Sequence, residues 1–391
     1  MRLLHVADLH LDRNFEGISE FPAVIQAEIT TANQAVYENI ITTAIAEKVD
    51  VVIFAGDNFH QPQISLKMQR LFVEGLEKLV AHEIVPVVVF GNHDYFEVGK
   101  FWFNFPEKAL VFTEETVKSA TVTLANGETV CFSGFSYCKP KITERKALEF
   151  PLRQNTTYHI GIYHGEVGIN HFAPFQVAEL QEKAYDYWAL GHIHKGDALY
   201  ERAYYSGTPQ GHNRKETAGT GVLLVELAGG AIDVQHLEVA TVVWQQQVIS
   251  LEKCQRVQEV VDFLVQKIQV NDESLRLLEL KLTDIAHLGA DFLMKLQNQE
   301  LLMLVQAQLL QESNQRVFLY RLVLAEESLQ TSKLLIPQEL LEQGIGNYRN
   351  QQIFQEVMQD LLIQPVFTQL FMQKEFQEQV LAATKERLSQ L

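Results

Sequence analysis

Four short apolar runs within residues 1–163 constrain the fold of this chain more than any other feature of its sequence. They are RLLHVA (2–7), VVIFA (51–55), VPVVVF (85–90) and HIGIY (159–163). Each has the length and the β-branched content of a strand that is buried on both faces. Helical patterns lie between the first three runs, at about 22–47 and 64–82. This alternation predicts an α/β fold.

Two later segments predict β-hairpins. ATVTLANGETVCFSGF (120–135) places strand-like runs on either side of Asn126-Gly127, and GVLLVELAGGAIDVQHLEV (221–239) does the same around Gly229-Gly230. Such glycine-containing pairs are typical of tight hairpin turns. We therefore expect a layered mixed-sheet domain over residues 1–240.

The remaining sequence predicts a second, smaller domain. Beyond about residue 242 it again alternates between strand-like and helix-like segments, with one helix expected over 289–311. We expect a small α/β capping domain over 241–335 and C-terminal helices over 336–391. The amphipathic pattern of 350–390 predicts either a docking element for a partner or packing onto its own domain.

Side chains that can bind metal ions follow each early strand and also the run YDYWAL (185–190). Ligand sites in α/β sheets form at the carboxyl ends of the strands, so we expect these side chains to meet at one edge of one sheet. They are Asp8, His10, Asp57, His60, Asn92, His93, Asp94, His164, His192 and His194.

The residue types indicate a site for two divalent ions. Asp8 and His10 are two residues apart, as are His192 and His194, and alternation in an extended segment predicts that each pair shares a face. The carboxylate of Asp57 can bridge two ions. A mixed shell of imidazole, carboxylate and amide oxygen suits Mn²⁺, Fe²⁺ or Zn²⁺ better than Mg²⁺, and we expect Mn²⁺.

Five short motifs resemble those of the calcineurin-like metallophosphoesterases: DLH (8–10), GDNFH (56–60), GNHD (91–94), YHGE (163–166) and GHIH (191–194). Together with YYSGTPQGHNRKETAGTGVLLVEL (204–227), GDNFH resembles the SbcD-type DNA exonucleases, and more narrowly their YhaO-like branch. The motifs cover residues 1–240, and the resemblance beyond them is one of layout.

The resemblance also implies a role for each residue of the motifs. The first ion would be held by Asp8, His10, Asp57 and His194. The second would be held by Asp57, Asn92, His164 and His192. His93 would act as the general acid with Asp94 orienting its ring, and His60 would help to position phosphate.

The charge of the chain bears on its partners. A formal net charge of −17 argues against a free-standing nucleic-acid binder, since such proteins neutralise phosphates with Lys and Arg. Two bound divalent ions would nevertheless make the site itself positive. Arg214 and Lys215 are the best candidates for phosphate contacts. The resemblance implies DNA as substrate and an SbcC-like coiled-coil ATPase as partner, and we expect a homodimer.

These features favour a metal-dependent DNA exonuclease, with endonuclease activity also possible. The alternatives are a phosphatase or phosphodiesterase for small-molecule or protein substrates, and an inactive scaffold for an ATPase. The three cysteines fit no disulfide or Cys-x-x-Cys pattern, and the first residues lack the features of a secretory signal, so we expect a cytoplasmic protein. No apolar run is long enough for a membrane span.

Overall fold

The computed structural model describes residues 1–217, 219–268, 274–311, 316–325, 376, 378–382 and 384. The chain divides into two compact units, of which the first comprises Met1–Gln247, Val265–Glu279 and Leu302–Arg321. The second comprises Val248–Leu264, Leu280–Leu301 and the residues from Leu322 onward. The predicted docking segment 350–390 lies outside the described residues except for a few positions, and the boundaries at 240 and 335 stay predictions.

The first sheet has six strands in the order β12-β11-β1-β2-β3-β4. Strands β1 to β4 are parallel, and β11 and β12 extend the sheet as an antiparallel hairpin turning on Gly229 and Gly230. The sheet is therefore mixed, as predicted. Its strands are β1 (Arg2–Val6), β2 (Val51–Ala55), β3 (Val85–Val89), β4 (Leu110–Val111), β11 (Val222–Ala228) and β12 (Ala231–Leu237).

A second six-stranded sheet has the order β5-β6-β7-β8-β10-β9. The prediction that all site residues follow strands of one sheet is wrong, because β7 and β8 belong to this second sheet. Two facing sheets can each direct loops to a common end, which strand order along the chain does not reveal. The strands are β5 (Lys118–Thr123), β6 (Thr129–Gly134), β7 (Tyr158–His164), β8 (Tyr187–Gly191), β9 (Asp197–Tyr200) and β10 (Ala203–Tyr205).

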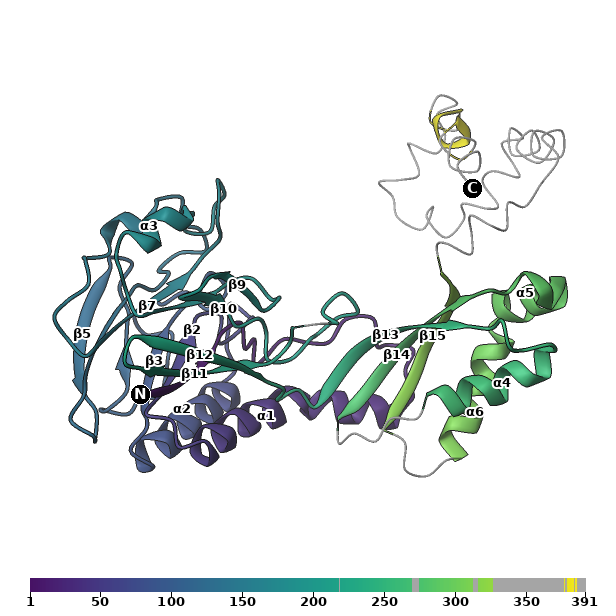
Figure 1. Cartoon of the computed structure of the whole chain (residues 1–391), viewed down its shortest axis with the longest axis horizontal. Coiled ribbons are helices and arrows are strands. Elements are labelled where there is room, and N and C mark those ends of the chain that lie inside the picture. The colour runs from purple at the N-terminus through teal and green to yellow at the C-terminus, as the bar shows by residue number, and fades with distance from the viewer. Residues whose placement is uncertain are drawn as a thin grey trace. The chain divides into compact units, whose positions relative to one another are not determined.

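The core of the first unit has two layers, one on each face of the first sheet. Successive residues of a strand point to opposite faces, so Val51 and Ile53 pack against strands of the second sheet. Val52 and Phe54 instead pack against helices α1 (Ala23–Ala46) and α2 (Leu66–Ala81), which cover the other face (Figure 1). Burial on both faces explains the continuous apolar runs of the sequence.

The outer face of the second sheet carries a further apolar cluster, which includes Phe135, Tyr163 and Trp188. The short helices η1 (Lys146–Glu149) and α3 (Val177–Gln181) contribute to it. All three layers are mainly apolar, and the buried polar side chains of this unit include Asp8, His10 and Asp57, which follow strands of the first sheet.

A third sheet has the order β13-β14-β15, with β13 (Val242–Ser250), β14 (Leu275–Thr283) and β15 (Val317–Leu324). The single helix predicted over 289–311 is two helices, because Gln299 adopts a left-handed backbone with φ of 62°. No helix among the described residues is long and apolar enough to cross a membrane. The helices that follow β13 are α4 (Val257–Lys267), η2 (Ala286–Leu288), α5 (Gly289–Gln297) and α6 (Glu300–Gln311).

Candidate metal centre

Two groups of side chains converge at the carboxyl ends of β1, β2, β7 and β8. Each group has the composition of a metal site. One is Asp8, His10 and His194, and the other is Asp57, His164 and His192. Within each group the candidate ligand atoms all lie within 4.8 Å of one another. Each group contains three residues of one of the two ligand sets that the sequence resemblance implies, the first group without Asp57 and the second without Asn92.

Short distances between ligand atoms show how closely the first group converges. Nε2 of His10 lies 3.1 Å from Nε2 of His194. The other ring nitrogen of His10, Nδ1, is buried and has no hydrogen-bond partner among the described residues. A buried imidazole whose nitrogens have no hydrogen-bond partner other than a second imidazole is costly unless a cation is bound, so this donor set fits a metal ion.

The second group converges on an amide oxygen. Oδ1 of Asn92 lies 3.1 Å from Nε2 of His164 and 3.0 Å from Nδ1 of His192. Nδ1 of His164 lies 2.9 Å from the carbonyl oxygen of Ala55, which fixes the ring and leaves Nε2 facing the site. Such an outer hydrogen bond selects the nitrogen that binds a metal.

The carboxylate of Asp57 faces both groups. Its Oδ2 atom lies 3.4 Å from Nε2 of His164 and 3.9 Å from Nε2 of His10. Its Oδ1 accepts a hydrogen bond of 2.9 Å from the backbone N–H of His93. A carboxylate oxygen that faces both imidazole groups can bridge two ions.

The backbone at these positions is strained rather than extended. Asp8, His10, Asp57 and His192 have φ of 51°, 44°, 52° and 97°. Left-handed backbone at non-glycine residues costs about 1–3 kcal/mol each and concentrates at functional sites. The prediction that Asp8 and His10 share a face through strand alternation is therefore wrong, because turns bring them together. The alternation is absent at His192 as well, because this residue has a left-handed backbone, and His192 and His194 belong to different groups.

Glycines allow the close approach of the two groups. A Cβ atom on Gly91 would lie 2.2 Å from Oδ1 of Asp57 and 2.6 Å from Nε2 of His164. At Gly56, where φ is 93°, it would lie 2.4 Å from Nδ1 of His164. The glycines of the GDNFH and GNHD motifs are thus required for space and not only for turning.

Burial and proximity shift the pKa values of the acidic groups in opposite directions. Burial raises the pKa of Asp8 and outweighs the neighbouring His164 and His194, which lower it. Burial also tends to raise the pKa of Asp57. The charge of His164 and its hydrogen bond to Asp57 lower this pKa by more than burial raises it, so the net shift is downward. The same pairing raises the pKa of His164 despite its burial. As the pH falls, Asp8 therefore takes up a proton before Asp57 does.

His93 lies beside the two groups and belongs to neither. Its ring stacks on that of His60 with centroids 4.4 Å apart, and it meets the ring of His10 edge-on at 5.2 Å. Burial lowers the pKa of His60 to about 4, so the stacked partner is neutral at pH 7. The half-buried ring of His93 is thus held next to the candidate ligands.

Asp94 does not orient the ring of His93, contrary to the expectation from the resemblance. Its Oδ1 accepts a hydrogen bond of 2.7 Å from the backbone N–H of Gly91. Its Oδ2 accepts bonds of 2.8 and 2.9 Å from the backbone and side-chain N–H groups of Asn58. Asp94 therefore holds together the loops that carry Asp57 and Asn92.

Two carboxylates that hold candidate site residues were missed in the sequence. Oε1 of Glu216 lies 2.9 Å from Nδ1 of His194, and Oδ1 of Asp12 accepts a bond of 2.6 Å from the backbone N–H of His60. Asp12 continues the two-residue spacing of Asp8 and His10 in the sequence and could have been found from it. No local pattern connects Glu216 to His194, although it follows Arg214 and Lys215 in the same motif.

We expect Glu216→Gln to weaken metal binding by about 10–100-fold, the usual effect of removing an outer partner of a histidine ligand. Burial raises the pKa of Glu216, but the hydrogen bond to His194 lowers it more, to about 2, so a full negative charge supports the ring. Calorimetric titration of metal-stripped protein with Mn²⁺ measures the change. The matched control is Glu201→Gln, since Glu201 is exposed. Equal affinities for all three proteins would contradict this role.

Arg214 and Lys215 are exposed and lie away from both groups, at the edge of a pocket that also contains Arg13. Arg13 links this pocket to the centre, because it donates a hydrogen bond of 3.2 Å to Oε1 of Glu216. Arg214 and Lys215, which were singled out in the sequence, therefore line the same pocket as Arg13, which contacts a partner of the candidate ligand His194.

Comparison with known proteins identifies relatives of this architecture. A family model described as calcineurin-like phosphoesterase matches residues 1–196. The chain is 32% identical over 260 residues to the uncharacterized metallophosphoesterase YhaO of Bacillus subtilis, covering 64% of this chain and 63% of that protein.

Two further relatives are named for DNA repair or nuclease activity. The chain is 26% identical over 260 residues to the DNA double-strand break repair protein Mre11 of Methanocaldococcus jannaschii, covering 61% of this chain and 66% of that protein. It is 35% identical over 95 residues to the SbcD component of the SbcCD nuclease of Bacillus subtilis, covering 24% and 22%. The match spans less than two thirds of the YhaO and Mre11 relatives and about a fifth of the SbcCD relative.

Proposed function

Since the chain belongs to the calcineurin-like phosphoesterases, we propose that it is a metal-dependent DNA exonuclease that hydrolyses phosphodiester bonds at the centre described above. The observation that carries this proposal is the position of Asp57, whose Oδ2 faces both imidazole groups. The names of the Mre11 and SbcCD relatives support DNA as the substrate. Endonuclease activity is a further possibility of the same chemistry.

The proposed metal set follows the resemblance residue by residue. Two bound divalent ions would supply Lewis acidity that activates water and offsets negative charge on the phosphate. The mixed shell of imidazole, carboxylate and amide oxygen suits Mn²⁺, Fe²⁺ or Zn²⁺ better than Mg²⁺, and we propose Mn²⁺ with Fe²⁺ and Zn²⁺ as alternatives. The first ion would be held by Asp8, His10, Asp57 and His194, and the second by Asp57, Asn92, His164 and His192.

The protein's own residues would orient the reaction and move the proton. His93 lies next to both groups without belonging to either, and it would donate a proton or hydrogen bond to the departing oxygen. His60 would keep that ring in place by stacking and would help to position the phosphate. Asp94, through Gly91 and Asn58, would fix the loops that carry Asp57 and Asn92.

The chain's proposed partners rest on similarity. An SbcC-like coiled-coil ATPase would add cationic surface to this acidic chain, and a homodimer would present two centres to one DNA. The C-terminal residues 336–391 are the proposed docking element.

Cytoplasmic location is proposed on the three free cysteines, since thiols persist in reducing compartments.

One experiment separates the exonuclease from its alternatives. Metal-stripped protein is incubated with end-labelled duplex DNA, with bis-p-nitrophenyl phosphate and with p-nitrophenyl phosphate, and Mn²⁺ or Mg²⁺ is added back. We expect two ions per chain by elemental analysis and cleavage of DNA and the diester, faster with Mn²⁺. Hydrolysis of the monoester without DNA cleavage would favour a phosphatase, and inactivity on all three would favour a scaffold.

A further inference from the structure

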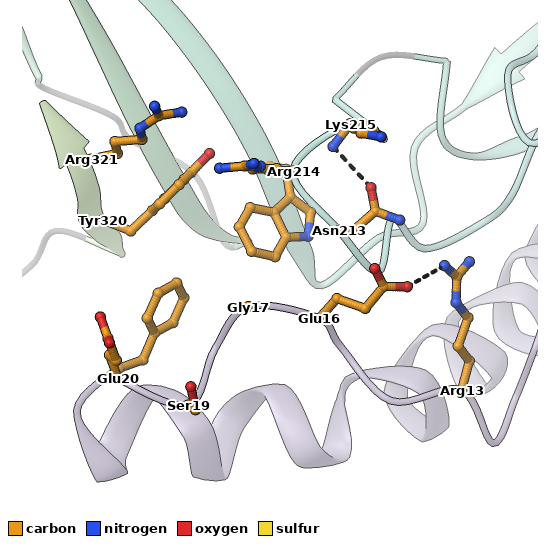
Figure 2. A pocket seen from close by; sticks show the side chains of 12 residues that line it. Arg13, Glu16, Gly17, Ser19, Glu20, Asn213, Arg214, Lys215, Tyr320 and Arg321 are labelled. Atoms are coloured by element: carbon orange, nitrogen blue, oxygen red, sulfur yellow. Dashed lines mark hydrogen bonds and ion pairs between the residues drawn. The ribbon is translucent and has the colours of Figure 1, made fainter. Parts of the chain in front are cut away.

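A pocket of about 780 Å³ lies in the first unit, beside the candidate metal centre. Its lining comes from the loop after β1, the loop before β11, and strands β13 and β15, and all of these residues belong to the same unit. Figure 2 shows Arg13 and Lys215 on one side, Tyr320 and Arg321 on the other, and Arg214 between them.

The lining is cationic in a protein that is strongly acidic. It contains four cations and two carboxylates, whereas the whole chain has 32 basic and 49 acidic residues. The cations are Arg13, Arg214, Lys215 and Arg321, and the carboxylates are Glu16 and Glu20. A local excess of positive charge on such a chain indicates a site for an anionic group.

Two of these cations are available to a ligand. Arg13 pairs with Glu16 at 2.8 Å, and Arg321 lies 3.4 Å from Glu279. Neither Arg214 nor Lys215 forms an ion pair with any residue that the structure describes. Both are exposed, so they can contact a phosphate without first breaking an internal ion pair.

Aromatic rings lie beside these free cations. Phe21, Trp244 and Tyr320 all line the pocket, with centroids 5.2 Å apart for Trp244 and Tyr320 and 6.0 Å apart for Phe21 and Tyr320. Figure 2 shows the half-buried ring of Tyr320 extending toward Arg214. An aromatic surface next to an unpaired guanidinium suits a ligand that combines a phosphate with a flat ring.

The pocket is connected to the candidate metal ligands by two hydrogen bonds. Arg13, which lines it, donates to Oε1 of Glu216, and that oxygen lies 2.9 Å from Nδ1 of His194. The pocket therefore begins two side-chain contacts from a candidate ligand, so a polymer with one phosphate at the metal centre would have its neighbouring nucleotides near the pocket. A free nucleotide would not need this proximity.

We propose that the pocket binds a nucleotide of single-stranded DNA next to the bond that is cleaved, with the phosphate on Arg214 and Lys215 and the base against Tyr320. The identity of the polymer rests on the proposed nuclease function. The pocket supplies sequence-independent contacts, because stacking and phosphate pairing are available to every nucleotide. It also places phosphate-binding groups on a chain whose net charge opposes DNA binding.

Binding can be measured apart from catalysis. The full-length protein is kept in a chelator and titrated with a fluorescein-labelled single-stranded dT 12-mer and with an abasic 12-mer that has the same phosphates. Fluorescence anisotropy is recorded between 50 and 200 mM salt, about the range over which phosphate contacts weaken strongly. The variants are Arg214→Ala with Lys215→Ala, Tyr320→Leu and Tyr320→Phe. The control is Lys67→Ala with Lys141→Ala, two exposed cations outside the pocket.

We expect the double variant to bind both strands more weakly, and its salt slope to fall in magnitude by about 1.4, since each single-strand phosphate contact contributes about 0.7. Tyr320→Leu should weaken dT binding by about tenfold and leave abasic binding unchanged, because it removes the stacking surface and no phosphate contact. Tyr320→Phe keeps the ring and controls for the hydrogen bond from the Tyr320 hydroxyl to Glu279. Tyr320→Phe and the control should bind as the wild type does. Thermal unfolding of each variant verifies that it is folded.

Wild-type binding and slope in the double variant would overturn the proposal, as would equal effects of Tyr320→Leu on both strands. A parallel cleavage assay with Mn²⁺ separates the two hypotheses. If the wild type binds as expected but cleaves no DNA, the nuclease function fails and the pocket stands. If it cleaves DNA while the variants bind normally, the pocket alone fails.

Discussion

Asp57→Asn is expected to lower hydrolysis of DNA and of bis-p-nitrophenyl phosphate by about 10³-fold or more. The Oδ2 atom of Asp57 is the oxygen that faces both His10 and His164. An amide has no charge with which to hold two cations, so we expect one ion or none to bind. Lewis-acid stabilisation by a metal is worth several kcal/mol, and each 1.36 kcal/mol changes the rate about tenfold.

The variant should nevertheless fold. Its amide oxygen can still accept the hydrogen bond from His93, and removing one charge relieves repulsion among the buried carboxylates of Asp8, Asp57 and Asp94. Elemental analysis, turnover with saturating Mn²⁺ and thermal unfolding are measured together. Asp233→Asn is the matched control, since Asp233 is exposed on β12. Two ions per chain with normal turnover in Asp57→Asn would contradict the bridging role.

Much of the fold followed from local patterns because local physics determines those elements. The apolar runs at β1, β2 and β3 are buried on both faces, and burial of that kind leaves a continuous apolar sequence. The hairpin of β11 and β12 turns on Gly229 and Gly230, both of which have positive φ. Glycine adopts positive φ without steric cost, and a strand buried on both faces needs a continuous apolar run, so both features can be placed without tertiary information.

Tertiary arrangement was not predictable in the same way. The alternation of strands and helices does not record that β7 and β8 lie in a different sheet from β1 to β3. The left-handed backbone of Asp8 and His192 is likewise invisible in the sequence, because the surrounding structure imposes it on residues that do not favour it. Such strain is more common at functional sites than in the rest of a protein. In the rest of a protein, local propensity and the fold usually agree.

The candidate site was predictable to the extent that its residues form short motifs. Asp57 and Asn92 lie in Gly-Asp and Gly-Asn-His-Asp segments directly after strands, and the chemistry of their side chains is evident there. The support for those residues was not predictable. Glu216 reaches His194 across a separation of 22 residues, and Tyr320 shares a pocket with Arg13 from the other end of the described chain.

His93→Ala is expected to retain both metal ions and to lower DNA cleavage by about 10²–10⁴-fold, the usual effect of losing a general acid. The ring belongs to neither donor group, so its removal leaves the ligands in place. The backbone N–H that donates to Asp57 remains in the variant. His236→Ala is the control, because His236 is exposed on β12.

The leaving group distinguishes proton transfer from a structural effect. The departing oxygen of DNA is an alkoxide that must be protonated, whereas p-nitrophenolate leaves without a proton. If His93 is the general acid, His93→Ala should lose far more turnover on DNA than on bis-p-nitrophenyl phosphate at saturating Mn²⁺. Equal losses on the two substrates would show that the ring acts through binding or through its stacking on His60. Normal turnover on both would remove His93 from the mechanism.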